Sequence, residues 1–394
     1  MRILQIIPVF TEQFGGTTTV VKSISKELAK RHEVVVYTTN GFDTNPSHDF
    51  AAKCQKENGY VVFYFKRIRN LTFLSSTFGQ MNISIDMINQ IRANLKHFEV
   101  VHVHSWEQFP EILASYYAKK FSVPYVLQVH GSLHNYDSRN RLKQSYKMIF
   151  GDRVLQGASR LIAFNETEAE EYLAMHAPKD RIRIIPNGVD FSNYENLPPQ
   201  GNFKRFYNIG KDKKIILYLG RVNARKGIDF LVQGYYHFVK TTKRSDTLLV
   251  IAGPDDGYLS HIKSLVQTLG LSDLVLFTGL LSSDLKVYAY VDSTICVCLS
   301  PFEPFGVVTL EAAVCGKPVI VSKESPIASV VEEAKFGIAV EFNRIDKLAE
   351  ILDSHLKNTE ALEIMGQRGR KFVFDNYRSS EIVHKLENVY EELG

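Results

Sequence analysis

The sequence is poor in cysteine, which excludes a disulfide framework and disfavours a metal site built from cysteines. Its 394 residues include only four cysteines, which do not make a disulfide framework. Cys296 and Cys298 could form half of a metal site, but no partner pair of His or Cys lies nearby in the sequence. We therefore interpret them as core residues on one face of a strand. This cysteine usage favours a reducing, cytoplasmic location.

The sequence also lacks a long apolar run. No stretch approaches the roughly 18 residues that a transmembrane helix requires. Residues 1–8 resemble a signal peptide only superficially, because their apolar part is too short and has no cleavage-like end. We interpret them as a buried first strand. The chain is not expected to span a membrane, although it could bind to the surface of one.

Charge is nearly balanced over the whole chain but unevenly distributed. The formal net charge is +4, with a net +6 in residues 1–186 and a net −2 in the remainder. The basic half predicts an anionic partner. The segment 66–74 is basic and then apolar, and Arg139, Arg141, Lys143 and Lys147 form a second basic cluster. Both are typical of docking on an anionic membrane or a lipid phosphate, and a solvated basic face is the alternative.

Alternating strand and helix patterns predict an α/β protein with two mostly parallel sheets. A chain of this length favours two domains. Strands are predicted at 2–7, 33–38, 60–64, 99–103, 125–129, 160–164 and 182–186 in the first half. In the second half they are predicted at 215–220, 247–252, 274–278, 294–299, 319–322 and 338–340. The boundary is predicted near residues 186–188, and residues 379–393 form an amphipathic helical pattern.

One segment combines two carboxylates with a helix start. Glu303 follows the apolar strand pattern 294–299, and Glu311 lies eight positions later on a short predicted helix over 307–314. Gly316 is expected to end that helix at the C′ position. Open α/β sheets place ligands beyond the carboxyl ends of their strands, and helix N-termini bind anions. The segment therefore suits a nucleotide-sugar, which carries both phosphates and hydroxyls.

A second segment supplies positive charge. Arg221 and Lys226 lie five residues apart on the loop that leaves the predicted strand 215–220. A leaving diphosphate gains negative charge in the transition state, and fixed cations directed at it stabilise that charge. A solvated basic loop is the alternative when this segment is considered alone.

Together these segments resemble glycosyltransferase family four, a large family of retaining enzymes. The family pattern is Glu, seven residues and Glu, preceded by a strand that ends in Gly-Arg with Lys-Gly five to six residues further on. Glu303 and Glu311, Gly220-Arg221 and Lys226-Gly227 match it here. Weaker matches follow in the expected order along nearly the whole chain: Gly15-Gly16, His130-Gly131, and residues 186–190, 251–253 and 277–279.

The resemblance implies the GT-B fold, in which two Rossmann-like domains face a cleft. Residues 1–187 would bind the acceptor and residues 188–376 the nucleotide-sugar donor. A C-terminal helix over residues 377–394 would pack back on the first domain. No nucleic-acid partner is implied.

The resemblance also assigns roles to individual residues. Arg221 and Lys226 would stabilise the diphosphate, His130 would lie beside the donor sugar, and Glu303 would bind the hydroxyls of that sugar. Glu311 would accept hydrogen bonds from the ribose. The other implied substrate-binding positions are Gly15 and Gly16 at acceptor and phosphates, Gly253, Gly279 and Leu280 at the base, and Phe305, Gly306 and Val307 at sugar and phosphate.

Some features depart from the family pattern or lie outside it. Residues 222–225 follow Arg221 where many relatives carry an acidic or prolyl residue. Asp255 and Asp256 are adjacent, unlike the Asp-x-Asp of metal-dependent transferases, so we expect neither a metal nor a cofactor. His102, His104 and His134 have no comparable support, and we interpret them as structural or solvated.

We therefore predict transfer of a hexose from a UDP- or GDP-sugar to an acceptor hydroxyl, with retention at the anomeric carbon. A glycan or a lipid-linked molecule would be the acceptor, in the cytoplasm or at the cytoplasmic face of the membrane. A nucleotide-sugar epimerase of the same fold is one alternative, and a non-catalytic nucleotide-sugar-binding subunit is another. Incubating the donor with and without acceptor tests the first, and donor turnover by the purified chain alone tests the second.

Overall fold

The computed structural model describes residues 1–11, 16–39, 53–68, 82–133, 150–301 and 303–394. They form two compact units, one of Met1–Gly188 with Ser379–Gly394 and one of Val189–Arg378. The sequence placed the boundary one residue earlier, between 187 and 188. Helix α16 (Ser379–Glu391) belongs to the first unit, although the rest of the second half of the chain belongs to the second.

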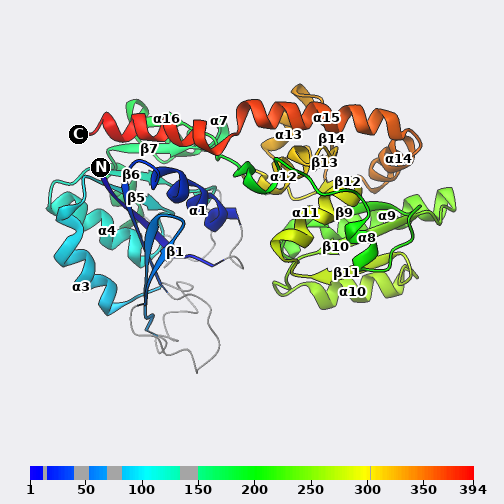
Figure 1. Cartoon of the computed structure of the whole chain (residues 1–394), viewed down its shortest axis with the longest axis horizontal. Helices are drawn as coiled ribbons and strands as arrows, with labels where there is room; N and C mark the ends of the chain where they lie inside the picture. The colour runs from blue at the N-terminus through cyan, green and yellow to red at the C-terminus, as the bar shows by residue number, and fades with distance from the viewer. Residues whose placement is uncertain (12–15, 40–52, 69–81, 134–149, 302) are drawn as a thin grey trace. The chain divides into compact units, whose positions relative to one another are not determined.

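The first unit contains an eight-stranded sheet in the order β3-β4-β2-β1-β5-β6-β7-β8. Strands β1, β5, β6 and β7 of this sheet are labelled in Figure 1. Its strands are Arg2–Val9 (β1), Glu33–Thr39 (β2), Lys53–Glu57 (β3), Tyr60–Phe65 (β4), Val100–His104 (β5), Tyr125–Gln128 (β6), Arg160–Ala163 (β7) and Ile182–Ile184 (β8). Its helices are Gly16–Leu28 (α1), Ile85–Asn94 (α3), Phe109–Lys120 (α4), Asp152–Gly157 (α6), Glu166–Ala174 (α7) and α16.

Strand β3 is the strand of the described residues that the sequence interpretation missed. It pairs antiparallel with β4, whereas the other neighbours in this sheet are parallel. Asn58 and Gly59 join the two strands with φ angles of 44° and 93°. An Asn-Gly pair with positive φ at both residues is a strong signal for a two-residue hairpin. The signal was therefore present in the sequence, although the flanking residues of β3 are mostly polar.

Alternation along the strands divides the first unit into two packed layers. Leu4 and Ile6 of β1 join the core formed with α3, α4, α6 and α7. The residues between them point to the opposite face, because successive strand side chains alternate. On that face His102 of β5 reaches Tyr390 of α16, with 2.7 Å between Nδ1 and the phenol oxygen. Helix α16 therefore covers the second face of this sheet, together with α1.

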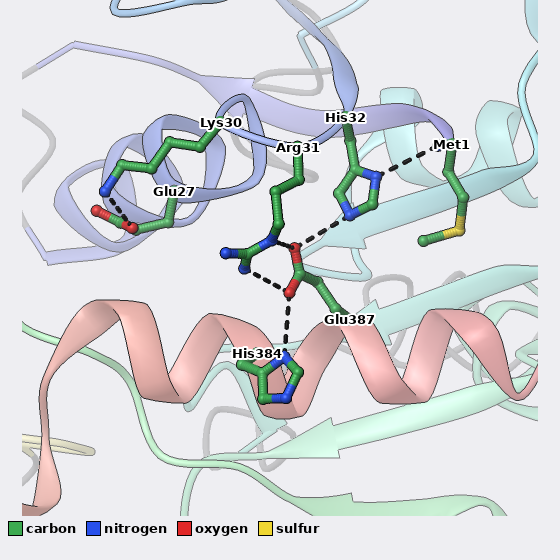
Figure 2. A network of polar contacts seen from close by, with 7 residues as sticks. All are labelled: Met1, Glu27, Lys30, Arg31, His32, His384 and Glu387. Atoms are coloured by element: carbon green, nitrogen blue, oxygen red, sulfur yellow. Dashed lines mark hydrogen bonds and ion pairs between the residues drawn. The ribbon is translucent and has the colours of Figure 1, made fainter.

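A buried carboxylate anchors α16. Glu387 is 3% exposed and accepts hydrogen bonds from Arg31 at 3.0 and 2.5 Å. His32 Nε2 lies 3.0 Å from the same carboxylate, and its Nδ1 lies 3.2 Å from the amino group of Met1 (Figure 2). The ammonium group can only donate, so Nδ1 accepts and the Nε2–H of His32 donates to Glu387. His32, the residue before β2, thus links the amino group of Met1 to Glu387 of the last helix.

The second unit contains a six-stranded parallel sheet in the order β11-β10-β9-β12-β13-β14. Its strands are Lys214–Leu219 (β9), Thr247–Ala252 (β10), Val275–Gly279 (β11), Ser293–Cys298 (β12), Val319–Ser322 (β13) and Gly337–Val340 (β14). Its helices are Asn202–Phe206 (α8), Ile228–Thr242 (α9), Leu259–Thr268 (α10), Ser283–Asp292 (α11), Val307–Val314 (α12), Ile327–Glu333 (α13), Ile345–Leu356 (α14) and Thr359–Asn376 (α15).

Helices cover both faces of this second sheet. Helices α9, α10 and α14 form a common core with β9, β10 and β12. Helices α11 and α12 lie against the other face, and α15 packs on α12. A Cβ atom on Gly366 of α15 would lie 1.9 Å from the carbonyl oxygen of Gly316, so only glycine allows this approach. No helix within the described ranges is long and apolar enough to cross a membrane.

Candidate active site

Four neighbouring strands of the second unit end at one edge of the sheet. Gly279 is the last residue of β11, and the other three strands lead to Gly253 after β10, Gly220 after β9 and Glu303 after β12. The strand order reverses between β9 and β12, because β10 and β11 lie on one side and β13 and β14 on the other. Ligands of open α/β sheets bind at such a reversal. The predicted residues of this unit therefore lie where the fold favours a ligand site.

Glycines bring the ends of β9, β10 and β11 into backbone contact. Gly253 donates its N–H to Gly279 at 2.8 Å, and a Cβ atom on Gly253 would lie 1.8 Å from the carbonyl oxygen of Gly220. Gly253 and Gly220 also have φ angles of 145° and 153°, which side-chain-bearing residues rarely adopt. Glycine at 253 is thus required by the packing of the loops. Leu280, beside Gly279, is 59% exposed.

Arg221 is held by a carboxylate from the neighbouring loop. Its Nη1 lies 2.8 Å from Asp256, and the Asn223 amide donates to the same oxygen at 3.1 Å. Asp255 points elsewhere and accepts from three backbone N–H groups at the start of α10, which lower the pKa of this exposed carboxyl. The two adjacent aspartates therefore have different partners, one a helix start and the other an arginine.

Lys226 and Glu303 form the second ion pair, with 2.5 Å between Nζ and Oε2. Their side chains are 25% and 27% exposed. Gly227 positions this lysine, since it has a φ of 66° and a Cβ there would lie 2.6 Å from the carbonyl oxygen of Leu299. Ser325 donates to the backbone carbonyl of Glu303 at 3.0 Å. Two residues 77 positions apart in the sequence are thus joined at the β9–β12 reversal.

Helix α12 begins directly after this ion pair. Gly306 caps it with a φ of 74°, and Val307 is its first residue. Phe305 is 8% exposed and lies with its ring 6.0 Å from that of Tyr377. The helix ends as predicted, with Gly316 at C′ in the left-handed region. An anion at the N-terminus of α12 remains a prediction, as do the sugar and phosphate contacts of residues 305–307.

Glu311 lies inside a polar network that the sequence did not reveal. Its side chain is 7% exposed, and its two oxygens contact Lys286 Nζ at 2.6 Å and the Tyr290 hydroxyl at 2.9 Å. Burial raises the pKa of Tyr290, and the nearby Glu311 charge adds to this shift. Tyr194 also forms a hydrogen bond with the Glu311 side chain. A carboxylate has four lone pairs, so Glu311 can still accept one further hydrogen bond. Nothing in the spacing of residues 286 and 311 indicates this contact, which arises from the packing of α11 against the sheet.

The candidate histidine of the first unit has a partner that the sequence analysis regarded as merely structural or solvated. His130 follows β6 in the left-handed region, with a φ of 54°. Its Nε2 lies 2.9 Å from His104 Nδ1, and His104 Nε2 lies 2.5 Å from the Gln5 amide oxygen. We call Gln5, His104 and His130 the histidine chain. Burial lowers the pKa of His130 to about 3 and that of His104 well below its usual range.

Other predicted residues of the first unit are only partly described. Gly16 is the first residue of α1, so Thr17 to Thr19 lie in the first turn of this helix. Gly15, His134, Arg69 to Leu74 and the basic residues at 139, 141, 143 and 147 lie outside the described residues. Of the first basic segment, Arg67 Nη1 lies 3.4 Å from the Asn82 amide oxygen.

Comparison with known families decides the class of this protein. Residues 14–193 match the model of Glycosyltransferase Family 4, and residues 199–372 match the model of Glycosyl transferases group 1. The chain belongs to glycosyltransferase family four. It is therefore an enzyme of the glycosyltransferase class, as its sequence motifs indicated.

Relatives and solved structures agree with this family. The chain is 26% identical to an uncharacterized glycosyltransferase of Methanocaldococcus jannaschii over 96% of its own length and 94% of the relative's. It is 24% identical to N-acetyl-alpha-D-glucosaminyl L-malate synthase of Bacillus anthracis, with the same coverage. Crystal structures of Anabaena HepE with UDP and with UDP-glucose each superimpose with a TM-score of 0.79 at 16% identity, with 100% of both chains covered. The GT-B fold expected of the family is thus confirmed.

Proposed function

We propose that this glycosyltransferase moves a hexose from a UDP- or GDP-sugar to an acceptor hydroxyl, with retention at the anomeric carbon. The supporting observation is the ion pair between Lys226 and Glu303 at the reversal of strand order, beside the start of α12. This arrangement offers a cation for phosphate and a carboxylate for sugar hydroxyls within one short contact. HepE was crystallised with UDP and UDP-glucose, which favours testing uridine donors first.

The proposed reaction needs no covalent enzyme intermediate. The acceptor oxygen forms a bond to the anomeric carbon as the bond from that carbon to the diphosphate oxygen breaks. The proton of the acceptor hydroxyl passes to the leaving diphosphate, and the products are a glycoside and a nucleoside diphosphate. Arg221 and Lys226 stabilise the charge that develops on the diphosphate, a role in which a divalent cation serves other transferases.

The two cations are already neutralised by Asp256 and Glu303. A diphosphate must compete with these carboxylates or share the donors with them. Lys226 has three N–H donors and Arg221 has five, so each can hold a phosphate oxygen and keep its carboxylate. Sharing would keep the Glu303 side chain oriented for the sugar. We therefore assign Lys226 a second role, which is to hold the Glu303 carboxylate in place.

Donor turnover by the purified full chain tests the proposal. We expect one nucleotide-sugar of a UDP and GDP panel to raise the melting temperature, because a ligand that binds only the native state stabilises it. The same donor should be consumed faster when a suitable acceptor is present, with full activity in excess chelator. Epimerised sugar without acceptor, or activity that a divalent ion alone restores, would contradict the proposal.

The acceptor class is proposed from charge. The net +6 of residues 1–186 favours an anionic acceptor or an anionic membrane surface. Flotation with anionic and neutral vesicles measures this preference. Equal recovery from both kinds of vesicle would remove the membrane from the proposal and leave a water-soluble acceptor.

A further inference from the structure

The histidine chain links three neighbouring segments of the first sheet. Gln5 lies on β1, His104 ends β5, and His130 follows β6 by two residues. Gln5 and His104 are both 0% exposed. The contacts of 2.5 and 2.9 Å are short enough for hydrogen bonds at both ends of the His104 ring. His104 therefore has both nitrogens engaged, which fixes the orientation of its ring.

The direction of these hydrogen bonds follows from their chemistry. The amide oxygen of Gln5 can only accept, so His104 Nε2 carries a hydrogen. Burial keeps the imidazole of His104 neutral, since it lowers the pKa of this group well below 6.5. A neutral imidazole has one N–H, so His104 Nδ1 is an acceptor. The hydrogen of the 2.9 Å contact must then come from His130 Nε2.

The remaining nitrogen of His130 has no hydrogen-bond partner among the residues that the structure describes. Its Nδ1 is buried and makes no hydrogen bond in the structure as described. With the hydrogen on Nε2, Nδ1 presents a bare lone pair. A buried acceptor that lacks a partner lowers stability, and a ligand that donates a hydrogen bond removes this penalty.

The backbone at His130 is held as firmly as its ring. Gly131, with a φ of 76°, donates its N–H to Glu168 Oε1 at 2.5 Å. The other oxygen of Glu168 accepts from the Phe164 N–H at 2.9 Å. Glu168 is 1% exposed and lies in the first turn of α7. The left-handed turn that presents His130 is thus tied to the end of β7.

We propose that Gln5 and His104 are positioning residues that hold His130 as its Nε2–H tautomer, so that Nδ1 accepts a hydrogen bond from a hydroxyl of the bound sugar. The proposal rests on the proposed donor function for the identity of that hydroxyl. The tautomer itself does not depend on any activity. A site that accepts a hydrogen bond rejects a sugar that lacks the hydroxyl, because the acceptor then stays unpaired.

Nitrogen NMR of the full chain, labelled with ¹⁵N at histidine, tests the tautomer directly. The ring signals of His130 are assigned by their loss in His130→Gln. We expect Nε2 to be protonated and Nδ1 to be bare at neutral pH. A proton on Nδ1 would overturn the proposal, because it would mean that the amide of Gln5 faces His104 with its nitrogen. This measurement stands even if no donor is found.

Two substitutions at His104 test the positioning role. His104→Asn places an oxygen acceptor near the position of Nδ1, whereas His104→Leu removes the acceptor. We expect His104→Leu to lower kcat/KM for the preferred donor by up to about 100-fold and to abolish its preference over the matching deoxy-sugar. His104→Asn should restore much of both. Equal behaviour of the two variants, or an Nε2–H signal unchanged in His104→Leu, would overturn the proposal.

His102→Leu is the matched control. His102 is also fully buried on β5, but it bonds Tyr390 of α16. The substitution measures the general effect of a leucine at this face of the sheet. A loss of deoxy-sugar discrimination in His102→Leu as large as in His104→Leu would show that the effect is structural and would contradict the proposed role.

Discussion

The two units present their candidate residues in different physical states. In the second unit, Lys226 and Glu303 form an ion pair whose side chains are each about one quarter exposed. In the first unit, Gln5 and His104 are fully buried, and burial keeps the histidines neutral. Partly solvated ions can exchange one partner for another at low cost, whereas buried neutral groups keep one geometry. The first arrangement suits a diphosphate, and the second suits a single hydroxyl.

Among the substitutions considered, removal of the Lys226 cation should have the largest effect on activity. We expect Lys226→Ala to lower turnover about 100- to 1,000-fold, as is typical when one donor to a developing oxyanion is lost. Donor binding should weaken by less, because the phosphate charge grows only in the transition state. Steady-state kinetics and calorimetry with the donor measure the two effects.

Lys347→Ala is the control for this change, since Lys347 forms an exposed ion pair with Glu350 at 2.7 Å in the same unit. It should leave turnover unchanged. If Lys226→Ala weakened binding as much as turnover, the lysine would be a general anchor for the donor and not a catalytic group.

Substitution of Glu303 and of Glu311 in the second unit should have different effects on binding and turnover. Glu311→Gln should weaken binding of the free nucleoside diphosphate by about 1–3 kcal/mol, because it removes a charged acceptor for the ribose. Glu303→Gln should leave that binding nearly unchanged, lower turnover and relax discrimination between epimeric sugars. Calorimetry with the diphosphate and kinetics with two epimeric donors measure the difference. Equal loss of diphosphate binding in both variants would show that the assignment is wrong.

Because His130 is buried and neutral, its contribution to the free energy of unfolding should depend on pH. Its folded pKa of about 3 lies below the usual value near 6.5, so the unfolded chain takes up a proton first as pH falls. Its contribution to the free energy of unfolding should therefore be about 2 kcal/mol lower near pH 5 than near pH 8. The difference between wild type and His130→Gln in urea unfolding at each pH isolates this effect.

Comparing the two proteins at the same pH is necessary because other groups act in the opposite direction. Burial raises the pKa of Glu111 and Glu168 to about 8. The contribution of these carboxyls to the free energy of unfolding therefore falls as pH rises from about 4.5 to 8. They are present in both proteins, so their effect cancels. A difference that does not vary with pH would mean that His130 titrates normally in the folded state.

The smallest effect is expected for a substitution at Glu387, which anchors α16, and it is an effect on stability. Burial acts to raise the pKa of Glu387, but hydrogen bonds from Arg31 and His384 outweigh it and lower the pKa. Glu387→Gln should destabilise the chain by about 1 kcal/mol, because Arg31 is half exposed and solvent weakens the pair. Urea unfolding measures it, with Glu391→Gln, on the exposed side of the same helix, as control. Equal midpoints for the two variants would show that the ion pair contributes nothing.

Much of the fold was predictable because its signals are local. The strand predictions of the second unit coincide with β9 to β14 within one residue, and helix α12 has the predicted bounds. An alternation of apolar runs with helical periodicity specifies such elements directly. The hairpin at Asn58 and Gly59 carried a local signal too, but the polar residues of β3 concealed the strand.

The partners of the candidate residues were not predictable in the same way. Asp256, Lys286 and Tyr290 contact Arg221 and Glu311 across 21 to 35 positions of sequence. His104 was interpreted from sequence as structural or solvated, yet it contacts His130 directly. Which side chains meet depends on strand order, and parallel neighbours are joined by long crossovers whose lengths do not encode that order.

The sequence by itself determined the α/β class, the positions of the two glutamates and two cations, and the family to which they belong. The tertiary structure alone decided which charges neutralise one another and which histidine supports another. The physical reason is that periodicity and turn chemistry act over a few residues, whereas ion pairs and buried hydrogen bonds form between segments that only the sheet brings together. The histidine chain is the clearest case, since β1, β5 and the end of β6 each supply one of its members.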